Sequence, residues 1–342
     1  APPGVDPAAV VQAALAMGVA QLFGNTGPTG QRAMAAMDRR LAALATQGLP
    51  PAQAQASLDH GRALAAHVLA WAATDGGAVV DNMGFPHDWR PAPGPGHWVP
   101  TSLIRQQQTP LLPHWGDNRP FVLASGAACG LAAPPPYSEA PGSAFRAEAE
   151  EVWHVSKGLT EEQTTIARFW SDDPMLSPTP PGHWVAIALA ELEGQAAPLA
   201  RRAEVLALLG IAMSDAFVCC WHEKFRHDLL RPVTYIHRVI DPDWQPLLIT
   251  PPFPEYPSGH STLSGAAAEV LTALFGPGHA FVDRTHEDEG LAPRAFADFR
   301  AAAAEAGISR LYGGIHFRAA VERGLDQGRC VGAAVAELRM RA

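Results

Sequence analysis

The chain has 342 residues, of which 47% are apolar and 17% charged, and its mean hydropathy is near zero. This composition excludes intrinsic disorder, collagen-like repeats and coiled coils, and the length allows one large domain or two closely packed ones. The 34 acidic residues outnumber the 25 basic ones, for a net charge of -9, so no broad basic face and no nucleic-acid partner are expected.

Helical patterns begin in the first 76 residues, where apolar residues recur at helical spacing between breaks at 24–28 and 48–51 and predict three helices. Residues 77–143 are rich in Pro, Gly and Trp and predict a long irregular segment over a core. A capping box at 160–163 starts another helix. Further helices are expected at roughly 182–195, 198–230, 259–275, 293–306 and 321–341.

The fold class predicted by these patterns is all-α, because alternating apolar and polar runs between tight turns are nearly absent. No repeat of fixed period is evident, which favours a helical bundle over a solenoid. We expect 1–76 to form helices packed on the core, 77–143 an irregular segment and 144–342 a bundle with the candidate catalytic residues, together one compact unit.

No transmembrane segment is expected, because the longest apolar stretch, 205–221, is interrupted by Asp215. The chain starts Ala-Pro-Pro, as a processed or trimmed N-terminus would. We therefore expect a soluble protein and leave open export to a periplasm or out of the cell. The oligomeric state is also open, a homo-oligomer included.

Four cysteines could pair in three ways and show no zinc-finger spacing, so the pairing stays open: Cys129, Cys219, Cys220 and Cys330. Two of them, Cys219 and Cys220, lie in an apolar helical stretch and are interpreted as core residues.

Segment 221–232 places charged residues close together. On a continuous helix that ends before Pro232, one face carries Trp221, Lys224, Asp228 and Arg231. Lys224 and Arg231 would then be about 10 Å apart along the axis, a distance that two long side chains can close around a small anion. A solvated charged face is the alternative.

Segment 251–275 predicts an extended proline-rich stretch followed by an Ala-rich helix. Ser258 and Gly259 mark that start, where free backbone N–H groups can bind an anion. His260 falls in the first turn, where the helix dipole favours a neutral imidazole that can transfer protons. The alternative makes Ser258 a helix cap and His260 a packed residue.

Segment 308–318 contains Arg310 and His316, which a continuous helix would place about 120° apart. They meet only if the backbone leaves the helix, and Gly313-Gly314 lies where that could happen. A satisfied core histidine is the alternative for His316, yet Arg310 would still need an anionic partner. The three segments together predict a cage for a tetrahedral oxyanion, with one histidine to attack or ligate and one to move protons.

The order of the three motifs resembles the signature of the vanadium-dependent haloperoxidases and of the type 2 phosphatidic acid phosphatase superfamily to which they belong. The motifs are Lys224 with Arg231-Pro232, then 257–260 (PSGH), then Ser309-Arg310 with His316. The resemblance covers about the C-terminal half and indicates a bacterial chloroperoxidase-like member, which implies a bundle like those of vanadium chloroperoxidase and bacterial acid phosphatases. Residues 159–170 and 180–184 also resemble bacterial members.

The resemblance implies a role for each motif residue. His316 would bond vanadium, or become phosphorylated in a phosphatase, and His260 would be the acid-base residue. Five residues would hydrogen-bond vanadate, or phosphate or sulfate in its place: Lys224, Arg231, Ser258, Gly259 and Arg310.

Neighbouring positions also match. Trp221 and Phe253 resemble the halide pocket of chloroperoxidase-type members, since bromoperoxidases carry His at the second position. Asp173 resembles the acid that supports the motif Arg. The family commonly has Asp four residues after the motif His, and here that residue is Ala320. Either a backbone carbonyl orients His316 or the site is weakened.

The function that the resemblance implies is a vanadium haloperoxidase, in which vanadate accepts hydrogen peroxide, bromide or chloride is oxidised, and hypohalous acid reaches a small organic acceptor. An acid phosphatase with His316 as nucleophile is the alternative, because phosphate and vanadate are nearly isosteric. A third hypothesis is a non-catalytic helical protein that retains an anion site.

Overall fold

A computed structural model describes residues 3–77, 88–102, 108–173 and 177–340. The chain divides into two compact units, residues 1–78 and 79–342. The packing of the first unit on the core of the second stays a prediction.

The first unit consists of three helices, α1 (Pro7–Leu22), α2 (Pro28–Ala45) and α3 (Pro51–Ala72), as the breaks at 24–28 and 48–51 predicted. Each helix begins with a proline, whose fixed φ suits the first helical position and whose missing N–H costs nothing there. Helices α1 and α3 approach closely at Gly61, where an added Cβ would lie 2.3 Å from the carbonyl oxygen of Val10. A side chain at this position would separate the two helices.

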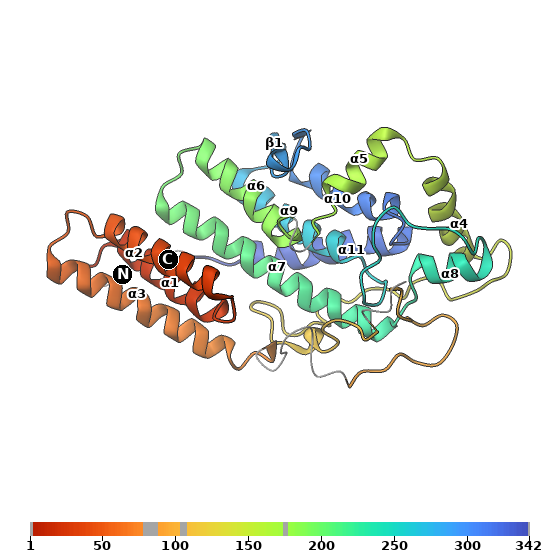
Figure 1. Cartoon of the computed structure of the whole chain (residues 1–342), viewed down its shortest axis with the longest axis horizontal. Helices are drawn as coiled ribbons and strands as arrows, with labels where there is room; N and C mark the ends of the chain where they lie inside the picture. The colour runs from red at the N-terminus through yellow and green to blue at the C-terminus, as the bar shows by residue number, and fades with distance from the viewer. Residues whose placement is uncertain (1–2, 78–87, 103–107, 174–176, 341–342) are drawn as a thin grey trace. The chain divides into compact units, whose positions relative to one another are not determined.

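The second unit is a helical bundle with one two-stranded antiparallel sheet, which confirms the all-α class (Figure 1). Its helices are α4 (Ala144–Lys157), α5 (Glu161–Phe169), α6 (Pro180–Gly194), α7 (Leu199–His227), α8 (Pro232–Val239), α9 (Gly259–Phe275), α10 (Phe299–Tyr312) and α11 (Arg318–Ala336). The sheet pairs β1 (Phe281–Asp283) with β2 (Arg294–Phe296), and the 3-10 helices within the described residues are η3 (Trp115–Asp117) and η4 (Glu287–Glu289).

Helix α9 is the centre of the bundle and packs against α7, α10 and α11. Its contact with α11 is close because both helices carry glycine: an added Cβ on Gly328 would lie 2.1 Å from the carbonyl oxygen of Thr262, and one on Gly265 would lie 2.7 Å from that of Leu325. The Ala- and Gly-rich sequence thus brings the start of α9 and the start of α11 together, and two of the three motifs lie there.

Helix α7 is the one described helix whose length and apolar composition would suit a membrane span, and 56% of its most apolar window is buried inside the structure. The carboxylate of Asp215, which interrupts that stretch, is fully buried and accepts the backbone N–H groups of 121–123. Cys219 and Cys220 are buried and free, which confirms their interpretation as core residues. The remaining two cysteines form a disulfide between Cys129 and Cys330.

The C-terminal end of α7 corrects one sequence expectation. The helix stops at His227, because Asp228 adopts a left-handed conformation (φ 51°) and its carboxylate accepts the N–H groups of Ala92 and Trp98 from the irregular segment. Arg231 instead caps the separate helix α8. The prediction of a continuous helical face from Trp221 to Arg231 was therefore wrong.

Other boundaries confirm or correct the predictions. The capping box at Thr160 is present, and α9 begins and ends where predicted. The helix expected from 293 begins at 299, because 294–296 form β2 and Asp298 caps α10. The described parts of 77–143 contain η3 and otherwise turns and extended chain.

Candidate active site

Arg231 and His316 lie in direct contact at the centre of the candidate site. The guanidinium donates from Nε to the carbonyl of Phe253 (2.9 Å) and from Nη1 to that of Ile315 (2.9 Å), and Nη1 lies 3.1 Å from Nε2 of His316. Because arginine only donates, Nε2 of His316 must present its lone pair and Nδ1 must carry the proton. His316 therefore directs an unprotonated nitrogen at the guanidinium.

Glu255 holds the other side of the imidazole. Its Oε1 lies 2.8 Å from Nδ1 of His316 and also accepts the N–H of Phe317 (2.9 Å). The side chain has no solvent exposure, and burial raises its pKa to about 8 against the opposing charges of Arg231 and Lys224. Burial, together with Arg231, also holds the pKa of His316 well below its usual range, so the imidazole is neutral.

This contact corrects the two explanations considered for Ala320. Neither a backbone carbonyl nor a weakened site replaces the family's usual Asp, since Glu255 supplies a carboxyl group from a different segment. The sequence analysis missed Glu255, although it lies only three residues before Ser258. The sequence offered one indication of its role: Glu255 is a charged residue inside the proline-rich segment that precedes α9. A charged residue that becomes buried needs a partner.

Lys224 is fully buried on α7 and points at the segment that precedes α9. Its Nζ donates to the carbonyls of Pro254 (3.1 Å), Glu255 (3.0 Å) and Pro257. Burial lowers its pKa to about 8. Lys224 thus uses three donors to hold this segment, and binding an anion requires it to exchange one of them.

Trp221 and Phe253 form an aromatic wall beside these cations. Their ring centroids are 5.0 Å apart, and the Phe253 ring lies 5.2 Å from Nζ of Lys224 and 5.1 Å from the guanidinium carbon of Arg231. The two residues assigned to a halide pocket therefore lie together and contact the cationic groups.

The start of α9 has the predicted geometry. Ser258 caps the helix by accepting the N–H of Ser261 (3.3 Å), and Gly259 and His260 occupy the first turn. Burial and the charge of Arg310 lower the pKa of His260 to about 3, so the imidazole is neutral before any anion binds. Its side chain retains 20% exposure.

Arg310 reaches the site from the last turn of α10, and the backbone then leaves the helix at Gly313-Gly314, as predicted, with Gly314 at φ 77°. Its Nη1 donates to the carbonyl of Trp170. Burial lowers its pKa to about 10, and its charge in turn lowers that of Arg231. The glycine pair is what allows Arg310 and His316, six residues apart, to serve one site.

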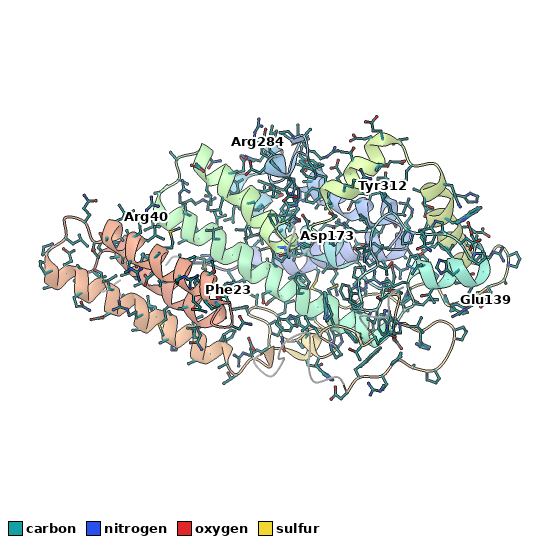
Figure 2. All side chains as sticks on the ribbon, in the orientation of Figure 1. Phe23, Arg40, Glu139, Asp173, Arg284 and Tyr312 are labelled. Carbon is teal, nitrogen blue, oxygen red and sulfur yellow. A yellow bond between two sulfur atoms is a disulfide. The ribbon has the colours of Figure 1, made fainter. Side chains whose placement is uncertain are left out.

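Two neighbouring carboxylates, Asp172 and Asp173, act on the charge of Arg310. Asp173, labelled in Figure 2, is exposed, and no hydrogen bond or ion pair joins it to Arg310 among the described residues. Asp172 is 2% exposed, affects the pKa of Arg310 more strongly, and lies 3.8 Å from Nε2 of His260. Asp173 as the acid that supports Arg310 therefore stays a prediction, and Asp172 is a second carboxylate whose charge acts on the same guanidinium.

Asp172 belongs to a buried network that the sequence analysis missed. His183 lies between Asp172 (2.8 Å) and Asp283 (2.7 Å), and His286 contacts the same oxygen of Asp172 (3.2 Å). Burial opposes the ionised forms, yet these bonds outweigh it and shift the pKa of Asp172 down to about 2 and that of His183 up to about 9. The network holds a fixed negative charge beside His260.

Several buried nitrogens of the site have no hydrogen-bond partner among the residues that the structure describes. We call Lys224, Arg231, His260, Arg310 and His316 the cage. Unpaired nitrogens within it are Nη2 of Arg231, Nε of Arg310 and Nε2 of His260. Leaving such groups unpaired is costly, and a tetrahedral oxyanion supplies acceptors for all of them. The residues present therefore fit an anion such as vanadate, phosphate or sulfate.

Comparisons with known proteins agree with this geometry. A family model described as the VCPO second helical-bundle domain matches residues 204–342. Vanadium chloroperoxidase from Curvularia inaequalis is 30% identical over 160 residues, which span 39% of this chain and 24% of that enzyme. A solved structure described as the first bacterial vanadium-dependent iodoperoxidase is 38% identical with a TM-score of 0.86, and the match covers 96% of this chain and 79% of that one.

The chain belongs to the vanadium-dependent haloperoxidase family. A holo bacterial vanadium-dependent chloroperoxidase shares the fold at 16% identity, with a TM-score of 0.76 over 96% of this chain and 81% of that one. The cage lies on α7, α9 and α10 and on the segments that adjoin α8 and α11, entirely within the part that the family model matches.

Proposed function

We propose that this protein oxidises halide ions with hydrogen peroxide at a vanadate bound in the cage. The observation that carries the proposal is the combination of unpaired buried nitrogens on Arg231, His260 and Arg310 with a neutral His316 whose Nε2 lone pair faces the Arg231 guanidinium. When bound, vanadate activates peroxide without a change in its own oxidation state. The protein supplies charge neutralisation, orientation and proton transfer.

Each cage residue has a role in this proposal. Arg231, Arg310 and Lys224 would hydrogen-bond the anion's oxygens, together with the Ser258 hydroxyl and the Gly259 amide. His316 would bond vanadium through Nε2, because Glu255 keeps the proton on Nδ1. His260 would move the proton, since an anion beside it and Asp172 behind it raise its pKa from about 3 toward the working pH.

The halide would bind against Trp221 and Phe253, where aromatic edges and nearby cations favour a poorly hydrated anion. Bromide or chloride is the expected substrate from the aromatic pair, and iodide joins them because the 38% identical relative is described as an iodoperoxidase. Iodide is also the easiest of the three to oxidise, so it is the first to be measured. The acceptor would be a small organic molecule.

Export is a further part of the proposal. The disulfide between Cys129 and Cys330 supports it, because disulfides persist in oxidising compartments.

The deciding experiment compares the two chemistries of one cage. Protein stripped of anions and titrated with vanadate should gain peroxide-dependent triiodide formation with one vanadate bound per chain. The same stripped protein should hydrolyse an aryl phosphate weakly, and vanadate should suppress that hydrolysis. Aryl phosphate hydrolysis without any vanadate-dependent halide oxidation between pH 4 and 8 would replace the proposal with a phosphatase, and vanadate binding with neither reaction would replace it with a non-catalytic anion site.

A further inference from the structure

An apolar cavity of about 370 Å³ lies against α7 in the second unit, outside the cage. Its volume is within the range of about 300 to 1,000 Å³ that is typical of small-molecule sites. One face of α7 lines it with residues at helical spacing: Gly210, Met213, Ser214, Phe217 and Trp221. Gly210 is exposed and Trp221 buried, so the cavity runs inward from the surface.

Trp221 belongs to both the cavity and the proposed halide site. Its ring lies 5.0 Å from that of Phe253, and its Cζ3 would be 3.8 Å from a Cβ added to Gly259 at the start of α9. Lys224 of the cage follows one helical turn later on α7. The inner end of the cavity is therefore separated from the proposed oxidation site by a single indole ring.

The opposite wall is held firmly in place. It includes Leu112 and Trp115. The neighbouring carbonyl of Leu111 accepts the indole N–H of Trp221 (3.3 Å), and the N–H of Leu111 donates to the carbonyl of Pro252 (3.0 Å). Next to Trp115, Gly116 packs so closely on α7 that an added Cβ would lie 2.3 Å from the backbone nitrogen of His222. The cavity is thus preformed and does not depend on a ligand to open it.

We propose that this cavity binds the organic halogen acceptor, and that the acceptor class is a planar, uncharged, electron-rich arene. Trp115, Phe217 and Trp221 supply aromatic surfaces for such a ring, and Ser214 offers a hydroxyl that can pair with a phenol group. Charged acceptors are disfavoured because the described residues of the lining include no ionised side chain to pair with them.

The inference rests on the proposed function for its oxidant. Hypohalous acid formed at the cage would meet the arene across Trp221. A carbon–halogen bond forms, the oxygen–halogen bond breaks, and the proton lost from the ring carbon joins the departing hydroxide as water. Capture at this distance would favour a bound arene over one in bulk solution.

Binding is tested first, on vanadate-free protein. Isothermal titration with 2-naphthol should show one site, and Gly210→Phe should weaken it at least tenfold by filling the cavity. The substitution has room, because a Cβ on Gly210 meets no atom within 4 Å. Gly210→Ala is the matched control and should bind within twofold of wild type, while Ser214→Phe fills the cavity from a second position. The proposal would be overturned if wild type did not bind 2-naphthol, or if both Phe variants bound it as tightly as wild type does.

Capture is tested next, on vanadate-loaded protein with peroxide and bromide. Wild type should brominate 2-naphthol over 6-hydroxynaphthalene-2-sulfonate at least fivefold more selectively than reagent hypobromous acid does, and Gly210→Phe should return to the reagent's ratio. Triiodide formation should stay within twofold in all variants, because Gly210 lies outside the cage. A wild-type ratio equal to the reagent's would overturn the capture. Loss of triiodide formation in wild type would count against the proposed function, with the titration still deciding the cavity.

Discussion

The buried histidines His316 and His183 lie in contrasting polar surroundings within the second unit. His183 has a carboxylate on each ring nitrogen, so we call Asp172, His183 and Asp283 the saturated network, and the pKa of His183 is raised to about 9. His316 has one carboxyl group behind it and cationic groups in front, and burial with those charges lowers its pKa. The saturated network is suited to structural support. The cage, with donors left unpaired, is suited to binding an anion.

The sharpest test of this contrast is His316→Ala, with the largest expected effect. Loss of the only nitrogen proposed to bond vanadium should lower peroxide-dependent halide oxidation by about a thousandfold or more. The remaining donors should still hold phosphate, measured by titration calorimetry. Activity near that of wild type would remove His316 from the mechanism.

His183→Gln tests the saturated network through stability. Removing the cation between Asp172 and Asp283 should cost about 3 kcal/mol of unfolding free energy at pH 6. The folded-state pKa of about 9 lies above the ordinary histidine value of 6.5, so the contribution of His183 is fully present below pH 6.5 and is lost as the pH rises through 9.

The difference between wild type and His183→Gln should therefore shrink from pH 6 to pH 9 in urea unfolding curves. His286→Gln is the matched comparison and should give a smaller difference, because His286 contacts only one of the two aspartates. A difference that does not change with pH would show that His183 is neutral in the folded protein.

Glu255 tests the support behind His316. Glu255→Ala should lower halide oxidation by about 10- to 100-fold, because the imidazole loses the partner that keeps its proton on Nδ1. Glu255→Gln retains an acceptor oxygen and should recover part of the activity. Equal losses in both variants, with unchanged thermal stability, would contradict a role for the hydrogen bond between Glu255 and His316.

The smallest expected effect concerns Phe253, which contacts the cage without contributing a charge. Phe253→His should change the ratio of iodide to bromide oxidation by tenfold or more, which corresponds to about 1.4 kcal/mol, because it makes the halide site more polar. Aryl phosphate hydrolysis by vanadate-free protein should change less. An unaltered halide ratio would place halide binding elsewhere.

Predictions from the sequence held where the cause was local. The capping box at Thr160 and the Ser258 cap are encoded within a few residues, and each marks a helix start. The glycine pair at 313–314 similarly predicted that the helix ends shortly after Arg310. The predicted end of α7 was wrong, because Asp228 is held by backbone N–H groups some 130 residues away in the chain.

The three motifs could be recognised from the sequence because each keeps a fixed spacing around the start or end of a helix. This spacing indicated the family and the residues of the cage. Glu255 behind His316, the contact of Asp172 with His183, and the pairing of Cys129 with Cys330 emerged only on folding. A side chain's partner depends on which segments α9 brings together, and burial then makes an unpaired charge costly enough to select that partner.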